Sequence, residues 1–84
     1  MAKLSSLPNI SDVLEKKLEQ AGIESADQLK EMGAEDAFIK LKTIDRLGAC
    51  INMLYAIEGA MQGIRWHGLD PARKQELKEF YWKL

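Results

Sequence analysis

The longest apolar stretch of the chain, LGACINMLYAIEGAM, fills residues 47–61, where only Asn52 and Glu58 are strongly polar. A helix that is apolar on most of its circumference must be covered on several sides. The stretch is too short and too interrupted to span a bilayer. The pattern therefore predicts a buried central helix over about residues 46–62, capped at its start by Asp45, on which shorter amphipathic helices pack.

The first of these shorter helices begins after an extended Leu7-Pro8 step, with residues 1–6 forming a short N-terminal extension. Ser11 is a good N-cap, and Gly22 is the glycine expected just past the helix end. The apolar residues of this helix recur at helical spacing, and we expect them to face the core. They are Val13, Leu14, Leu18 and Ala21.

The second helix has a capping box at residues 25–28, Ser-Ala-Asp-Gln. The serine hydroxyl and the glutamine side chain of such a box each satisfy a free backbone N–H of the first turn. Gly33 ends this helix, and a third helix is predicted from Ala34 to about Lys42. The segment IRWHGL, residues 64–69, reads as a connector that covers one end of the core with Ile64, Trp66 and Leu69.

The last helix begins at Asp70-Pro71, an N-cap aspartate followed by proline at the first helical position. It carries apolar residues at helical spacing, namely Leu77, Phe80, Tyr81 and Leu84. All links between helices are short, and no alternating strand pattern, repeat or linker interrupts them. We therefore expect one all-α domain over residues 1–84, a compact bundle of about five short helices.

The composition does not change the predicted fold, but it limits the classes of function that the chain can have. Lys plus Arg is 12 and Asp plus Glu is 13, which gives a formal charge of −1. A dedicated nucleic-acid domain usually carries a basic excess that displaces counterions from phosphates. We therefore expect weak or no autonomous binding of nucleic acid, although a local basic face stays open.

The residues that carry enzymatic or metal chemistry are scarce. The chain has one cysteine, Cys50, and one histidine, His67, unrelated in spacing, whereas a zinc site needs three or four ligands. Between two apolar neighbours, Cys50 is interpreted as a small buried apolar residue, and His67 as a surface residue on the connector. The chain is thus predicted to be no enzyme, with no catalytic residue, no metal site and no cofactor.

The N-terminus, MAKLSSLPN, has no apolar segment of the kind found in a secretory signal. With a single cysteine and no intramolecular disulfide to form, a reducing cytoplasm is the expected compartment. The absence of a spanning segment predicts no membrane association.

Glu58 interrupts the apolar central helix and needs a partner if it is buried. The candidates are Arg46 and Arg65, near the two ends of the predicted helix. A structural ion pair or exposure at the core edge is the favoured interpretation, and a role in binding a partner is the alternative. Gly59 and Gly63 are four residues apart and are expected to permit close approach of another helix.

The three consecutive aromatic residues Phe80, Tyr81 and Trp82 span about 200° of a helix, so they cannot all point inward. Tyr81 or Trp82 must be at least partly exposed. An exposed aromatic side chain near the C-terminus is a candidate contact with a partner.

The segment LPNISDVLEKKLEQAGI followed by ESADQLKEMG resembles half of a helix-hairpin-helix unit. That motif presents backbone N–H groups and a helix N-terminus to DNA phosphates. Asn9 and Ser11 occupy the positions of the motif's glycines, and Lys16 and Lys17 follow. The resemblance makes these four residues candidate phosphate contacts of a degenerate turn over residues 9–17, and it supports an alternative function as a small DNA-binding domain.

A broader resemblance covers roughly residues 5–80. The order LPNI, AGI, GAEDAFIKLK and LYAIEGAMQGIRW resembles the C-terminal domain of the TfoX/Sxy family of competence regulators. The resemblance implies a helix-hairpin-helix-like or SAM-like bundle and no catalytic residues. It implies a role in the regulation of competence and DNA uptake through a protein partner, such as a TfoX N-terminal-domain protein or the transcription machinery. The oligomeric state stays open, as does whether the chain is free-standing or an excised domain.

Overall fold

The computed structural model describes residues 3–46 and 48–84, which form five α-helices and two 3-10 turns. In chain order these are η1 (Leu4–Ser6), α1 (Asp12–Gln20), α2 (Ala26–Met32), α3 (Ala34–Ile44), α4 (Ile51–Gln62), η2 (Trp66–Gly68) and α5 (Pro71–Lys83). The molecule measures 31 × 26 × 20 Å, and no strand occurs among the described residues. The predicted all-α bundle is confirmed.

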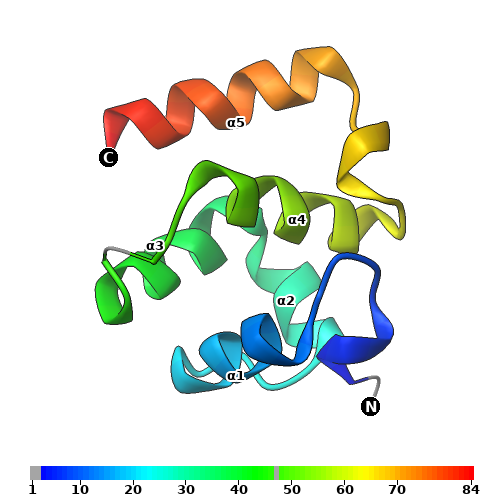
Figure 1. Ribbon diagram of the computed structural model, residues 1–84, viewed down its shortest axis with the longest axis vertical. Coiled ribbons are helices and arrows are strands. Elements are labelled where there is room, and N and C mark those ends of the chain that lie inside the picture. The colour runs from blue at the N-terminus through cyan, green and yellow to red at the C-terminus, as the bar shows by residue number, and fades with distance from the viewer. Residues whose placement is uncertain (1–2, 47) are drawn as a thin grey trace.

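Helix α4 lies in the middle of the bundle, with α5 on one side and α1 and α2 on the other (Figure 1). It contacts α2, α3, α5 and η2, whereas α1 packs against α3 and η1. Leu54, Ile57 and Ala60 of α4 are completely buried, and each large aliphatic side chain removed from water contributes roughly 1.5–3 kcal/mol. The apolar stretch therefore forms the central helix that its pattern predicted.

The start of this helix differs from the prediction. Helix α4 begins at Ile51, with Cys50 as its N-cap residue, and Leu47 lies outside the described residues. Asp45 does not cap it. The Asp45 carboxylate instead accepts a hydrogen bond from the backbone N–H of Gly48 at 3.0 Å, and the Asp45 carbonyl accepts one from Ala49 at 3.0 Å. These two bonds close a turn, and the hydropathy pattern had assigned part of that turn to the helix.

The first helix has the predicted ends. The Ser11 hydroxyl accepts a hydrogen bond from the backbone N–H of Leu14, and Gly22 has a positive φ of 89° just past the helix. The backbone N–H of Ile23 then reaches the carbonyl of Leu18 at 2.9 Å. Val13, however, is 65% exposed, because it lies about 100° around the helix from Leu14, whose side chain faces the core.

Helices α2 and α3 follow the capping prediction with one change. The backbone N–H of Gln28 donates to the Ser25 hydroxyl at 3.2 Å, but the Gln28 side chain accepts from Glu24 rather than from Ser25 itself. Helix α3 continues two residues beyond the predicted end, to Ile44. These two hydrogen bonds of the capping box therefore stabilise the short link between α1 and α2.

The ends of the chain contribute unequally to the core. Leu4, in the predicted N-terminal extension, is buried, whereas Leu84 at the other end is 51% exposed. In the connector Leu69 is buried but Ile64 is 37% exposed, so the prediction that Ile64 covers one end of the core was wrong. Leu84 follows the last residue of α5, where the spacing within the helix no longer fixes which way a side chain points.

The start of α5 agrees with the sequence. The Asp70 carboxylate accepts a hydrogen bond from the backbone N–H of Ala72 at 2.8 Å, and Pro71 takes the first helical position. Over the part of the chain that the structure describes, no helix combines the length and the apolarity that crossing a membrane requires.

Candidate interaction surfaces

The turn before α1 places Asn9 in the left-handed region, with φ of 68°. Its side-chain amide donates to the carbonyls of Ile64 at 2.9 Å and Ala56 at 3.4 Å, and its side-chain carbonyl accepts from the backbone N–H of Trp66 at 3.2 Å. The Asn9 side chain thus joins the turn to the end of α4 and to η2. It is directed into the protein, and only the backbone of the turn is left to meet a phosphate.

The other three candidate phosphate contacts have different surroundings. The Ser11 hydroxyl caps α1, and the Lys17 ammonium lies 2.6 Å from the Asp45 carboxylate. The hydrogen bonds from Lys17 and from Gly48 lower the pKa of Asp45. Lys16 is exposed and has no ion pair among the described residues. The structure therefore brings Asn9 and Ser11 into one turn but directs Lys17 to a carboxylate.

The C-terminal aromatic residues divide as their spacing requires. Tyr81 is half-buried, with its ring 5.8 Å from that of Phe38, and the Lys42 ammonium lies 5.2 Å from the Tyr81 centroid. Trp82 is 71% exposed, and its ring meets that of Tyr81 edge-on at 5.2 Å. The prediction that one of the consecutive aromatics is exposed is confirmed. Their role in contacting a partner stays a prediction.

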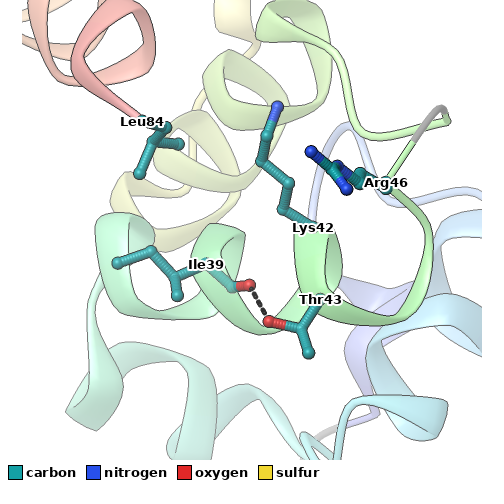
Figure 2. A pocket seen from close by; sticks show the side chains of 5 residues that line it. All are labelled: Ile39, Lys42, Thr43, Arg46 and Leu84. Carbon is teal, nitrogen blue, oxygen red and sulfur yellow. Dashed lines mark hydrogen bonds between the residues drawn. The ribbon is translucent and has the colours of Figure 1, made fainter.

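A shallow hollow of about 350 Å³ lies between the C-terminal part of α3 and the end of α5. We call it the α3–α5 hollow, and its lining residues are Ile39, Lys42, Thr43, Arg46 and Leu84. Figure 2 shows Ile39 and Leu84 on one side and Lys42 and Arg46 on the other. Sequence reasoning missed it because Leu84 lies 38 or more positions from the other four lining residues. The available signal was an isoleucine, Ile39, on the polar side of α3.

Glu58 is buried and pairs with Arg73 of α5. The Arg73 guanidinium lies 2.9 Å from the Glu58 carboxylate, 3.0 Å from that of Glu35 and 3.5 Å from that of Glu76. Burial acts to raise the pKa of Glu58, but hydrogen bonds from Arg73 and Gln62 prevail and lower it below its usual range. The hydrogen bonds to Glu58 and Glu35 raise the pKa of Arg73. One arginine therefore joins α3, α4 and α5.

This finding corrects the sequence-based choice of partner, since neither Arg46 nor Arg65 pairs with Glu58 in the described part of the chain. Arg46 borders the hollow instead. The structure supports the structural ion pair as the role of Glu58, because its charge is already matched within the domain.

The cysteine and the histidine of the chain are both exposed. Cys50 is exposed, which contradicts its predicted burial, because it precedes α4 instead of lying within it. His67 is exposed, as predicted, and its ring contacts that of Trp66 at 4.0 Å. Within residues 3–46 and 48–84, no three His, Cys, Asp or Glu side chains gather as metal ligands.

Comparison with protein families finds a match to the TfoX C-terminal domain over residues 1–81. The DNA transformation protein TfoX1 of Aliivibrio fischeri is 32% identical over 75 residues, which cover 89% of this chain and 36% of that protein. Protein Sxy of Escherichia coli K12 is 36% identical over 78 residues, covering 93% of this chain and 37% of Sxy. The chain spans little more than a third of the length of these relatives.

Two crystal structures of proteins from Listeria monocytogenes share the fold. The triclinic form of an uncharacterized protein superposes with a TM-score of 0.94 at 51% identity, covering 98% of this chain and 92% of that one. The tetragonal form of a protein of unknown function gives a TM-score of 0.93 at 51% identity, with 96% and 98% covered.

Proposed function

Because the chain belongs to the family of TfoX C-terminal domains, we propose that it is a non-enzymatic interaction module that regulates competence and DNA uptake through contact with a protein partner. The name of the Aliivibrio relative connects that protein with DNA transformation. The partner we propose is a component of the transcription machinery or a protein that supplies the TfoX N-terminal domain, and the compartment is the cytoplasm.

The observation that carries this proposal is the exposure of Trp82. Its side chain is 71% exposed at the last turn of α5, where it contributes little burial to the fold. Tryptophan is enriched among the few residues that supply most of the energy of a protein interface. An exposed indole beside a half-buried tyrosine ring gives a rigid apolar contact area at low entropic cost.

The test is the frequency of natural transformation in the source organism after replacement of Trp82→Ala at the native locus. Removal of an anchor residue weakens an interface by at least about tenfold, and we expect the transformation frequency to fall with it. Val13→Ala is the matched control, because Val13 is also an exposed apolar residue, 65% exposed, but on α1. Far-ultraviolet circular dichroism checks that both variants are folded.

The outcomes separate two parts of the proposal. An unchanged frequency after deletion of the whole chain removes DNA transformation from its function. If deletion of the chain abolishes transformation but the Trp82→Ala variant transforms at the normal frequency, the role in DNA transformation stands and Trp82 is not the contact.

A second candidate function, direct DNA binding by residues 9–17, is favoured by one observation. Asn9 has the positive φ of 68° that a glycine of the helix-hairpin-helix turn supplies, and α1 begins at Asp12, three residues later. Backbone N–H groups at a helix N-terminus bind phosphate. Fluorescence anisotropy with a labelled duplex at about 50 mM salt tests it, since phosphate contacts give salt-dependent binding.

The variants for that test compare two pairs of lysines. Lys16→Glu/Lys17→Glu must abolish any binding, whereas Lys30→Glu/Lys78→Glu, which changes exposed lysines on α2 and α5 by the same charge, must retain it. Absence of binding by the unmodified chain removes this second candidate.

A further inference from the structure

The α3–α5 hollow combines apolar side chains with positive charge. Ile39 and Leu84 are large hydrophobic residues left 42% and 51% exposed. Lys42 and Arg46 face them across the hollow (Figure 2). Such a juxtaposition is suited to a ligand that is apolar at one point and negatively charged beside it.

Neither cation of the hollow, Lys42 or Arg46, belongs to an ion pair in the part of the chain that the structure describes. None of the five lining residues has an acidic side chain. Asp45, the acid next to Arg46 in the chain, is already bound to Lys17 at 2.6 Å. The positive charge of the hollow is therefore available to a partner.

The fold accounts for only one of these cations. Lys42 lies in the last turn of α3, where a positive charge offsets the helix dipole, and it also contacts the Tyr81 ring at 5.2 Å. Arg46 lies beyond the end of α3 and makes neither contact in the described part of the chain. We regard Arg46 as the residue whose position is best explained by a partner.

We propose that the α3–α5 hollow binds an acidic segment of a partner protein that inserts an apolar side chain between Ile39 and Leu84. This inference rests on the proposed function and names the surface and the chemistry of the contact. A nucleic-acid strand fits less well, because it needs a run of cations along its backbone, and the hollow offers two in a chain whose formal charge is −1.

Fluorescence anisotropy with labelled peptides tests the proposal. The probe is Glu-Asp-Leu-Leu-Asp-Glu, and the two control peptides replace its leucines by glutamine or its acids by lysine. We expect saturable binding of the probe alone, and salt must weaken it because the charges are exposed. No saturation up to about 1 mM, the weak limit of a specific complex, or equal binding of all three peptides, overturns the proposal.

Variants of the chain locate the site. Arg46→Glu places like charges opposite the peptide and is expected to weaken binding at least about tenfold, and Ile39→Gln removes an apolar wall without emptying the core. Lys30→Glu is the matched control, an exposed lysine of α2 outside the hollow. Undiminished binding in both Arg46→Glu and Ile39→Gln overturns the proposal, as does tighter binding of a labelled DNA oligonucleotide that Arg46→Glu abolishes.

The same variants distinguish failure of this inference from failure of the proposed function. If no peptide binds while Trp82→Ala still lowers the transformation frequency, the function stands and the hollow is not its contact. If the peptide binds through Arg46 and Ile39 but deletion of the chain leaves transformation unchanged, the surface stands and the proposed process falls.

Discussion

Asn9 and Gly59 meet where the N-terminal turn packs against α4, and the absence of a side chain on Gly59 makes the contact possible. A Cβ atom on Gly59 would lie 2.6 Å from the Asn9 side-chain amide nitrogen and 2.9 Å from the carbonyl oxygen of Ile64. These two groups are hydrogen-bonded to each other at 2.9 Å. The close approach expected at Gly59 therefore occurs, but with a turn and the segment before η2 rather than with another helix.

Gly59→Ala is expected to destabilise the domain by about 1–2 kcal/mol. Alanine gains roughly 0.5–1 kcal/mol over glycine within a helix, but the added methyl group displaces a backbone carbonyl, and such overpacking costs typically 1–3 kcal/mol. Urea unfolding followed by circular dichroism measures the difference. Asn52→Ala, an exposed change in the same helix, is the control, and a Gly59→Ala variant of unchanged or higher stability contradicts the prediction.

Two substitutions of Asn9 separate its side-chain bonds from its backbone conformation. Asn9→Gly keeps the positive φ and loses the hydrogen bonds to Ile64, Ala56 and Trp66, at an expected cost of about 1–3 kcal/mol. Asn9→Ala loses those bonds and also adopts a left-handed conformation that costs an L-residue about 1 kcal/mol more. Urea unfolding should rank the native chain above Asn9→Gly and Asn9→Gly above Asn9→Ala. Equal stability of the two variants would show that the positive φ carries no strain.

Arg73→Met is expected to destabilise the domain by about 3 kcal/mol, because it leaves the buried Glu58 carboxylate without its cation. The double change Arg73→Met/Glu58→Leu removes both charges and should recover part of that loss. Glu76→Gln is the control, since the Glu76 side chain is 67% exposed and exposed pairs contribute at most about 1 kcal/mol. A double variant less stable than Arg73→Met alone would contradict a pairing role for Glu58.

The lowered pKa of Glu58 predicts a loss of stability in acid. The carboxylate is held charged in the folded state by Arg73 and Gln62 against the effect of burial, so its contribution is complete above the ordinary glutamate pKa of about 4.3. It is lost as the pH falls from there through the lower folded pKa. Urea unfolding at a series of pH values should show stability falling over this window, with a shallower fall in Glu58→Gln.

Asp45 has a lowered pKa as well, from Lys17 and Gly48, and it adds to the same acid loss. The Asp45→Asn variant separates the contribution of Asp45 from that of Glu58. Salt separates them as well, because the ion pair of Asp45 is more exposed than that of Glu58 and is more easily screened. A Glu58→Gln variant with the same pH dependence as the native chain contradicts the assignment.

The sequence predicted best what is decided within one helical turn. The caps at Ser11 and Asp70 depend on a side chain and a backbone N–H two or three residues away, so their partners are visible in the chain itself. The angle between consecutive side chains on a helix required Tyr81 or Trp82 to be exposed, and the structure exposes Trp82. The apolar stretch likewise located the centre of the fold, since a helix of that composition has to be covered.

Other predictions failed because they depend on residues far apart in the chain. The partner of Glu58 is an arginine on α5, and nothing local distinguishes Arg73 from Arg46 or Arg65 before α5 is placed. The α3–α5 hollow could not be predicted for the same reason, since Ile39 of α3 and Leu84 after α5 are far apart in the chain. Lys17, a candidate for phosphate, is bound to Asp45, and that pairing depends on how α1 packs on α3.

Cys50 gives the sharpest test of where α4 begins. Hydropathy placed it inside a helix between two apolar neighbours, whereas the structure makes it the extended residue before the helix, with φ of −111° and ψ of 169°. Its side chain is exposed, while the adjacent Ala49 is only 5% exposed. An accessible thiol reacts through its thiolate without any need for unfolding.

We therefore expect a maleimide reagent to label Cys50 in the folded chain at nearly the rate found for the urea-unfolded chain. Ala49→Cys/Cys50→Ala is the matched control, because it moves the thiol one residue into the buried position. Its labelling must be slow, since it requires an opening of the fold that exposes the site. If Cys50 is protected in the folded state as strongly as the thiol of that control, the helix begins earlier than Ile51 and the turn held by Asp45 is wrong.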